Sequence, residues 1–564
     1  HLVSKKKYWR ANNKTDLFVS CTSAYKIGDV DALASFYCIG GKNTTLTKND
    51  NSYSSAWDPN DQCVEGSGGP LCAVCSENFV KIGDECKPCQ GGADYFAPAM
   101  TLLSSCVLVF GITALIICRT HAHKEKKVSE LATEVKILVS WLQILSVVSQ
   151  TFDSVQWPSR FTSASQGANI VNLDLSFLMA SAGACKLALP FMGKFAVSAA
   201  TPFGLILSVK LAEFVGVRCS GTKKEAETED KQDKEDEIVK EEERLHPAHE
   251  KLEAQKSASA KMIITLLLLL YPSIANQAFT MFRCRTVDGL GTKQILEKDY
   301  SVECYVGDHA QYLFVAIAAI VVYAVGVPVA LYYMLWNNRH HLHDDDGIIS
   351  NREKEVRSRL GNFFLQYEES FWYFEILVLI FKLTLTGLFC IIARDSPFQV
   401  VLAFFVCSVY AMVLLRHTPY LTPDADLLAL VTSAALALTL LTGYVVTATN
   451  AFLKDQPEKL DESIYVMDIF LIAINVLPFA IFIFNLAKRA IIKRCRKSKN
   501  EDPQCRKPKN ETKIIPVNDS LSELGLSELE NDVASAKEQR KQQQSELEDR
   551  ARESWSPQTQ DSAN

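Results

Sequence analysis

The sequence lacks the short signatures by which many enzymes are recognised. It contains no nucleotide-binding glycine loop, no hydrolase nucleophile elbow, no HExxH pair and no kinase signature. We therefore expect neither enzymatic activity nor a bound cofactor. Charge of one sign is not in large excess either. The 564 residues carry a net charge of -6, concentrated in a few connecting segments and the tail, which gives no ground for a nucleic-acid partner.

No signal peptide is visible at the start of the chain, which begins with His1. Because the N-terminal part should be exported and oxidised, we expect the sequence to be a fragment or a processed form of a longer precursor. Inverted repeats, which many secondary transporters contain, are not evident either.

Long apolar blocks dominate the sequence, and 48% of its residues are hydrophobic. The clearest blocks are 262–282 and 311–336, each about 20 residues or more, which is enough for a helix to cross a hydrocarbon core of about 30 Å. The sequence therefore predicts an all-α polytopic membrane protein with about nine transmembrane helices. The other predicted spans are 96–118, 135–152, 191–215, 371–393, 398–415, 426–448 and 464–487. The span 135–152 is the least regular, since Lys136, Gln143 and Gln150 interrupt it.

Cysteines concentrate before residue 90 and predict a small disulfide-rich module that would need these bonds to stay folded. A zinc ribbon with the pairs Cys72/Cys75 and Cys86/Cys89 is the alternative. Nearby glycines permit tight turns, and Asn13 and Asn43 lie in glycosylation sequons. The candidates for disulfides are Cys21, Cys38, Cys63, Cys72, Cys75, Cys86, Cys89, Cys284 and Cys304. Seven precede residue 90, so one of those seven must pair elsewhere or stay free, with Cys185 as a candidate partner.

Sidedness follows from the loop between 282 and 311, whose Cys284 and Cys304 would form a disulfide only on the oxidising side. The basic segment 488–499 follows the last span and should face the cytoplasm. We therefore expect an extracellular module at 1–95, helices 1–3 at 96–215, a charged cytoplasmic linker at 216–260, helices 4–9 at 261–488, and a largely disordered cytoplasmic tail at 489–564. The protein would reside in the plasma membrane or an endomembrane, with its N-terminus extracellular or lumenal. The basic segment is either an ordinary end to the span or a site for anionic lipid headgroups.

Charged residues inside the predicted spans are the candidate site. Lys382 lies mid-span, where an unpaired ammonium would cost several kcal/mol. Glu375, on the same helical face, and Asp468, in the last span, are its candidate partners. These three residues line an ion or substrate path, or they form a buried structural pair. Prolines at 202, 272, 328 and 478 interrupt four spans, where freed carbonyls either bind ions or simply accompany helix packing.

Several segments resemble a known family. The chain is similar to the C-terminal multi-span region of large surface proteins of single-celled eukaryotes, in which an ephrin-receptor-like or EGF-like Cys repeat adjoins a membrane domain. More distantly it resembles fungal TRP-like and polycystin-like channels. The resemblance covers most of the chain up to residue 488 and is carried by Lys7-Tyr8-Trp9-Arg10, the segment from Cys63 to Cys89, Tyr271-Pro272-Ser273, Phe282-Arg283-Cys284-Arg285, Ser301-Val302-Glu303-Cys304, and the segment from Tyr373 to Leu388.

Two functions remain open from the sequence. The resemblance implies a TRP-like cation channel or a channel-like sensor whose extracellular module receives a stimulus. The alternative is a non-conducting surface receptor or adhesion protein that the spans merely anchor. In either case the lipid bilayer is a partner, the chain could form a homo-oligomer, and an extracellular ligand is not identified.

Overall fold

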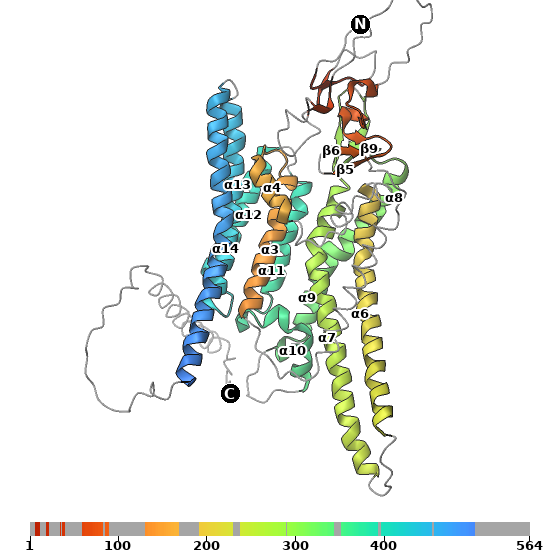
Figure 1. Cartoon of the computed structure of the whole chain (residues 1–564), viewed down its shortest axis with the longest axis vertical. Coiled ribbons are helices and arrows are strands. Elements are labelled where there is room, and N and C mark those ends of the chain that lie inside the picture. Colours follow the sequence, from red (N-terminus) through yellow and green to blue (C-terminus); the bar gives the residue numbers. More distant parts are fainter. Residues whose placement is uncertain are drawn as a thin grey trace, which may run out of the picture.

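A computed structural model gives the structure of the chain. It describes residues 6–11, 18–21, 34, 36–39, 59–82, 85–88, 130–168, 191–228, 237–288, 290–342, 351–392, 396–453 and 456–501. These residues are mostly helical, with short antiparallel strands in the N-terminal part and between two of the long helices. The axes of the long helices are broadly aligned, and the strands gather at one end of the helices (Figure 1). The predicted helical class is confirmed at this level.

Seven helices among the described residues are long and apolar enough to cross a membrane. The predicted count of nine is not confirmed. The predicted span 96–118 lies outside the described residues, and the predicted span 371–393 is not one continuous helix. The seven segments are Glu130–Thr151, Phe191–Phe214, Gln255–Thr280, Gly307–Asn337, Pro397–His417, Pro423–Phe452 and Glu458–Ile491.

The predicted span 371–393 breaks at Gly387. Helix α11 covers only Phe374–Thr386, and a short 3-10 turn, Leu388–Cys390, follows it. Thirteen α-helical residues rise roughly 20 Å, less than a hydrocarbon core. A Cβ atom at Gly387 would lie 2.6 Å from the ring of Phe279. The ring of a neighbouring helix thus comes close to the backbone at the point where α11 ends.

The helices form two neighbouring groups. The first contains α3 (Glu130–Thr151), α4 (Ser159–Gly167), α11, α12 (Pro397–His417), α13 (Pro423–Phe452) and α14 (Pro457–Glu501), which share one large apolar core. The second contains α6 (Phe191–Thr228), α7 (Glu237–Thr280), α8 (Gly307–Ala319) and α9 (Gly326–Asn337), and lies beside the first in Figure 1. A smaller cluster that includes Leu268, Leu335, Phe363 and Leu379 joins α7, α9 and α11 to α10 (Asn351–Phe364).

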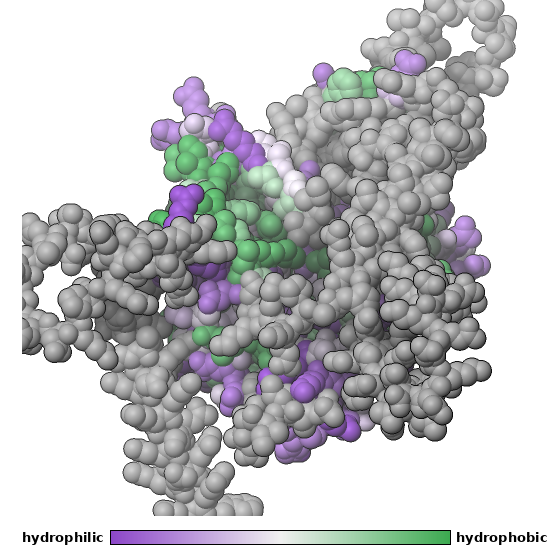
Figure 2. Space-filling view, turned by 60° about the horizontal axis from the view of Figure 1, so that its bottom comes forward, coloured by the Kyte–Doolittle hydropathy of each residue, from purple (hydrophilic) through white to green (hydrophobic). Residues whose placement is uncertain are grey.

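Hydrophobic side chains also cover much of the outside of the helices. Phe314, Phe405, Met412 and Ile483 are among many large apolar residues that are more than half exposed. In the coloured part of Figure 2, hydrophobic residues gather in one area, with hydrophilic residues above and below it. This distribution is typical of helices whose outer faces contact lipid.

A π-helical segment, Ile320–Val325, separates α8 from α9. Pro328 has no N–H group to donate to the carbonyl of Ala324 four residues earlier. The hydroxyl of Tyr271 on α7 donates to that carbonyl instead, at 3.0 Å. The carbonyl that Pro328 frees is therefore satisfied by a hydrogen bond between two packed helices, which agrees with a role in packing and not in ion binding.

The N-terminal part contains short paired strands and three disulfides. Strand β1 (Tyr8–Trp9) pairs with β2 (Val19–Ser20), β3 (Ser67–Gly68) with β4 (Val74–Cys75), and β5 (Phe79–Ile82) with β6 (Glu85–Pro88). The bonds join Cys21 to Cys38, Cys63 to Cys72, and Cys75 to Cys86. They divide the cysteines Cys72, Cys75 and Cys86 between two bridges, so the zinc ribbon is wrong.

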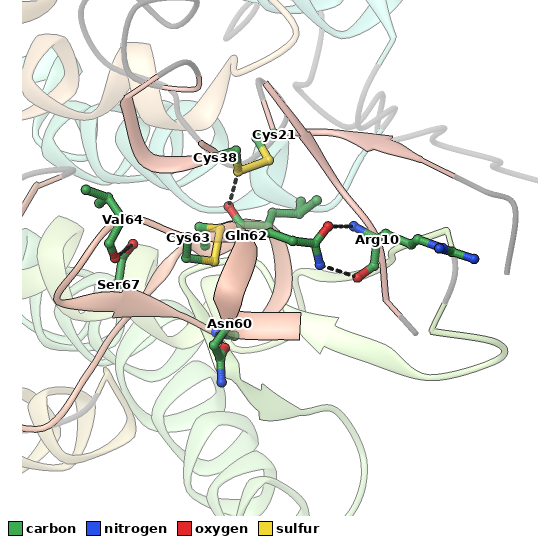
Figure 3. Close-up of a disulfide and its surroundings, with 11 residues drawn as sticks. Arg10, Cys21, Cys38, Asn60, Gln62, Cys63, Val64 and Ser67 are labelled. Carbon is green, nitrogen blue, oxygen red and sulfur yellow. Dashed lines mark hydrogen bonds between the residues drawn. A yellow bond between two sulfur atoms is a disulfide. The ribbon is translucent and has the colours of Figure 1, made fainter. Parts of the chain in front are cut away.

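Side chains add to these crosslinks. Gln62 holds the backbone of Arg10 from both sides, accepting from its N–H at 3.0 Å and donating to its carbonyl at 2.9 Å (Figure 3). Gly66, at φ +88°, adopts a conformation that favours glycine, and a Cβ there would lie 2.3 Å from the ring of Phe79. The tight turns expected at the glycines are therefore present at this position.

A second small sheet lies between α7 and α8. Strands β7 (Cys284–Thr286), β8 (Gln294–Leu296) and β9 (Asp299–Glu303) form an antiparallel hairpin sheet whose ends are joined by the disulfide between Cys284 and Cys304. Its residues Val287, Ile295 and Tyr300 belong to the same buried cluster as Trp9 and Leu71 of the N-terminal part. The N-terminal module therefore packs directly on this hairpin sheet.

Candidate functional site on the polar face of α3

Three polar residues of α3 lie seven residues apart and share one face of the helix. They are Lys136, Gln143 and Gln150, the residues that made this segment an irregular span in the sequence. Each contacts a different charged group on a neighbouring element. The polar interruptions of α3 therefore mark the interior side of the helix.

The first contact joins Lys136 to Glu375 at the start of α11. The Lys136 Nζ lies 2.7 Å from Glu375 Oε2, and the glutamate side chain is only 3% exposed. The same oxygen accepts hydrogen bonds from Gln366 Nε2 and the Tyr367 hydroxyl, each at 2.9 Å. Burial, followed by the charge of Glu375, raises the pKa of Tyr367 well above its ordinary value, so Tyr367 remains a donor. One carboxylate oxygen thus accepts hydrogen bonds from three donors.

The second contact joins Gln143 to Lys382. The Lys382 Nζ donates to Gln143 Oε1 at 3.2 Å, while Gln143 Nε2 donates to the Leu269 carbonyl of α7 at 2.8 Å. Lys382 is 6% exposed. Although Glu375 and Lys382 share a helix face as expected, the ion-pair partner of Glu375 is Lys136.

The third contact lies at the end of α3, where Lys298 of the hairpin sheet donates to Gln150 Oε1 at 2.8 Å. Arg283 lies at the same end. The guanidinium of buried Arg283 forms ion pairs with Asp153 and with Glu297, the latter at 2.8 Å, and donates to the Gln150 carbonyl at 2.9 Å. Burial lowers the pKa of Arg283, but the two carboxylates outweigh it and leave that pKa above its ordinary value. In the sequence, Arg283 is notable only as part of the segment that carries the family resemblance. Only its position immediately before Cys284 could have predicted that Arg283 lies beside the hairpin sheet at the end of α3.

Asp468 lies apart from these residues. Its Oδ1 accepts from the backbone N–H of Phe161 in the first turn of α4 at 3.1 Å, and its Oδ2 lies 3.9 Å from Arg160 Nε. A carboxylate at a helix N-terminus satisfies a free N–H and interacts favourably with the helix dipole. The structure therefore places Asp468 as a cap for α4, away from Lys382.

A cavity of about 40 Å³ lies among the first two contacts. Its polar lining includes Lys136, Glu375 and Lys382, together with the three tyrosines 367, 410 and 420. One water molecule needs roughly 10–15 Å³ measured in this way, so the cavity has room for a small polar guest. It is too small to serve as an open conduit.

A metal site is not supported at the one group of potential ligands found among the described residues, Cys284, Cys304 and His309. Both sulfurs are in a disulfide. One ring nitrogen of His309 accepts from the Tyr305 N–H at 3.0 Å, and the other lies 3.1 Å from the Met281 carbonyl. No ligand atom remains for a metal.

The remaining predicted sites have varied positions. Cys89, Cys185, Asn13 and Asn43 lie outside the described residues. In the basic segment, Lys488 lies 3.6 Å from Asp424, and Arg489 pairs with buried Glu134 of α3. The first two charges of the segment are therefore directed at the protein itself.

Comparison with known proteins gives one match. Residues 249–514, just under half of the chain, match the family model of the transient receptor potential (TRP) ion channel family. This supports the distant TRP-like relationship expected from the sequence, whereas the EGF-like or ephrin-receptor-like character of the module stays a prediction. No curated protein and no solved structure shows a significant match.

Proposed function

We propose that this protein is a TRP-like cation channel, or a channel-like sensor, embedded in a membrane. The match of residues 249–514 to the TRP ion channel family carries this proposal. Five of the seven helices with the length and composition of membrane spans lie entirely within that range. A channel family also agrees with the absence of enzyme signatures in the sequence.

The proposed orientation places the disulfide module at 1–95 outside the cell or in a lumen, and the tail at 489–564 in the cytoplasm. Disulfides persist in oxidising compartments. The helices that follow the module would be 96–215 and 261–488, with the charged segment 216–260 in the cytoplasm. The module would receive an extracellular ligand or another stimulus, and we leave that ligand open.

An aromatic group supports the proposed cytoplasmic boundary of the membrane. Tyr332 and Trp336 lie near the end of α9, and the ring of Tyr332 stacks on Trp372 with 6.0 Å between centroids. Arg339 lies 4.4 Å above the Trp336 ring. Aromatic rings with adjacent cations are typical of the membrane interface.

We assign Glu375 and Lys382 to a buried polar network rather than to an open ion path. Each already has a partner inside the first group of helices, and the cavity beside them is only about 40 Å³. A conducting path would then require another part of the chain or a second copy of it. Residues 488–499 remain a candidate contact for anionic lipids beyond Arg489.

Recording of current from purified protein in planar bilayers tests the channel. We expect cation current under some combination of potential, tension and added ligand, and Lys382→Met should alter gating without blocking conduction. Intact, monodisperse protein that passes no current under any such condition would remove the channel proposal.

The second candidate is a non-conducting receptor or adhesion protein. The pairing of all three predicted path residues inside the protein favours it. In that case the spans would anchor the module, and removing the module's ligand would change signalling through the tail while bilayer current stays absent.

A further inference from the structure

We propose that the cavity between α3, α11, α12 and α13 is a binding site for one small monovalent anion of the chloride or carboxylate class, held by Lys382 and Trp141. The cavity lies in the helix bundle at the second contact of α3. This site does not require the protein to conduct, so it stands apart from the channel proposal.

The charges that line the cavity are not balanced. The cavity lining contains two lysines, Lys136 and Lys382, and only one carboxylate, Glu375. Glu375 is paired with Lys136 at 2.7 Å, and its Oε2 accepts two further hydrogen bonds. The nearby Asp426 accepts from the Tyr420 N–H and does not line the cavity. The two lysines share one carboxylate, so the cavity lining carries one positive charge more than negative charge.

The cavity lining also includes buried hydrogen-bond donors that an anion could satisfy. An ammonium group has three donors. Within the described part of the chain, the one acceptor found for Lys382 is the neutral amide oxygen of Gln143, at 3.2 Å. Trp141 also lines the cavity and is 2% exposed, and its Nε1–H has no partner among the described residues. Buried donors without acceptors are costly. An anion is an acceptor only, so it satisfies these donors and the charge together.

Size limits the occupant. About 40 Å³ accommodates a few water-sized atoms, which suits a halide or a carboxylate group. The mixed polar and aromatic lining, with the Phe381 and Tyr410 rings stacked at 4.0 Å, surrounds the guest closely. We therefore favour a free small anion over the headgroup of a lipid.

Fluorescence of Trp141 tests the proposal, because this side chain lines the cavity. The protein is placed in nanodiscs of zwitterionic lipid at constant ionic strength, and iodide is added as the quenching probe. The chain has seven tryptophans, so the Trp141 signal is taken as the difference between the wild type and Trp141→Phe. We expect saturable quenching of this signal, relieved by chloride.

Two lysine variants separate the site from a general charge effect. Lys382→Met should weaken the saturable iodide effect about tenfold or more, which corresponds to about 1.4 kcal/mol. Lys210→Met removes a positive charge that is paired with Glu213 on α6 and does not line the cavity, so it should leave the effect unchanged. Size-exclusion profiles establish that both variants are folded.

Three results would overturn the proposal. The first is a Trp141 signal in the wild type that iodide does not quench saturably. The second is equal saturable quenching in Lys382→Met. The third is protection of Trp141 by added phosphatidylserine with no response to chloride, which would assign the cavity to a lipid headgroup. None of these results depends on whether the protein passes current.

Discussion

At the scale of single residues, the charged groups of this chain are matched to specific partners. Arg283 is 3% exposed and lies between Asp153 and Glu297, so it joins the end of α3 to the hairpin sheet. Asp468 caps α4, and Glu134 forms an ion pair with Arg489. These contacts join elements that are distant in the sequence, and each depends on a charge that would be costly to leave buried alone.

Replacing Arg283 by Gln should therefore destabilise the protein strongly. Two buried carboxylates would lose their cation, and breaking such a buried pair costs about 3–5 kcal/mol. The matched control is Lys293→Gln, because Lys293 pairs with Glu303 on the exposed side of the same hairpin sheet and should change stability by less than about 1 kcal/mol. Thermal unfolding in nanodiscs measures both variants, and equal losses would contradict the role assigned to Arg283.

The buried side chain of Tyr300 predicts how the stability of the protein depends on pH. Burial raises the pKa of Tyr300 above its ordinary value of 10, although nearby Arg285 acts in the opposite direction. The folded state thus retains the proton to a higher pH than the unfolded chain does. The contribution of Tyr300 to the free energy of unfolding is fully present below about pH 10. It decreases as the pH rises above that value.

The wild type should therefore lose more stability between about pH 9 and pH 11 than Tyr300→Phe does. Unfolding midpoints measured in parallel at both pH values test this. Curves that fall equally for the two proteins would show that Tyr300 does not titrate differently on unfolding.

At the scale of elements, the apolar runs predicted the positions of several helices, but not every helix end. Segments 398–415 and 426–448 differ from α12 and α13 by only a few residues at either end. The segment 371–393 is not one continuous helix, because α11 ends at Thr386. The break lies at Gly387, beside the Phe279 ring, and hydropathy contains no information on this contact. The polar face of α3 could have been found from the seven-residue spacing, whereas its partners depend on the tertiary arrangement.

The close approach at Gly387 predicts a specific cost. Gly387→Ala places a methyl group 2.6 Å from the Phe279 ring and should destabilise by about 1–3 kcal/mol through overpacking. Gly204→Ala on α6, where the added methyl group would meet no described side chain or neighbouring element within 4 Å, should be neutral or stabilising by up to about 1 kcal/mol. Chemical unfolding followed by circular dichroism compares the stability of the two variants. A Gly387→Ala protein as stable as the wild type would contradict the close contact between Gly387 and the Phe279 ring.

The π-helical segment depends on Tyr271 in the same way. Tyr271→Phe leaves the Ala324 carbonyl without its donor, which should cost about 1 kcal/mol in the membrane interior. Tyr333→Phe is the control, because Tyr333 is 67% exposed on α9. Thermal unfolding midpoints provide the comparison, and identical midpoints would mean that Tyr271 does not hold this segment.

At the scale of the whole molecule, a disulfide-bonded module adjoins a helical membrane part. The sequence predicted both parts from their cysteines and apolar runs. It did not predict that Trp9 and Leu71 would pack with Ile295 and Tyr300 of the hairpin sheet, because these residues are far apart in the chain and carry no shared pattern. Through Arg283, the module is thereby connected to α3 and its polar face.

The proposed function depends on the side of the membrane on which the disulfide module lies, and labelling of intact cells tests this sidedness most directly. A membrane-impermeant maleimide is added before and after an impermeant reductant, and the labelled cysteines are identified by mass spectrometry. We predict that Cys75, Cys86, Cys284 and Cys304 are labelled only after reduction, whereas Cys495 is labelled only after the membrane is permeabilised. Labelling of Cys495 in intact cells, with the disulfide cysteines protected until permeabilisation, would reverse the proposed topology.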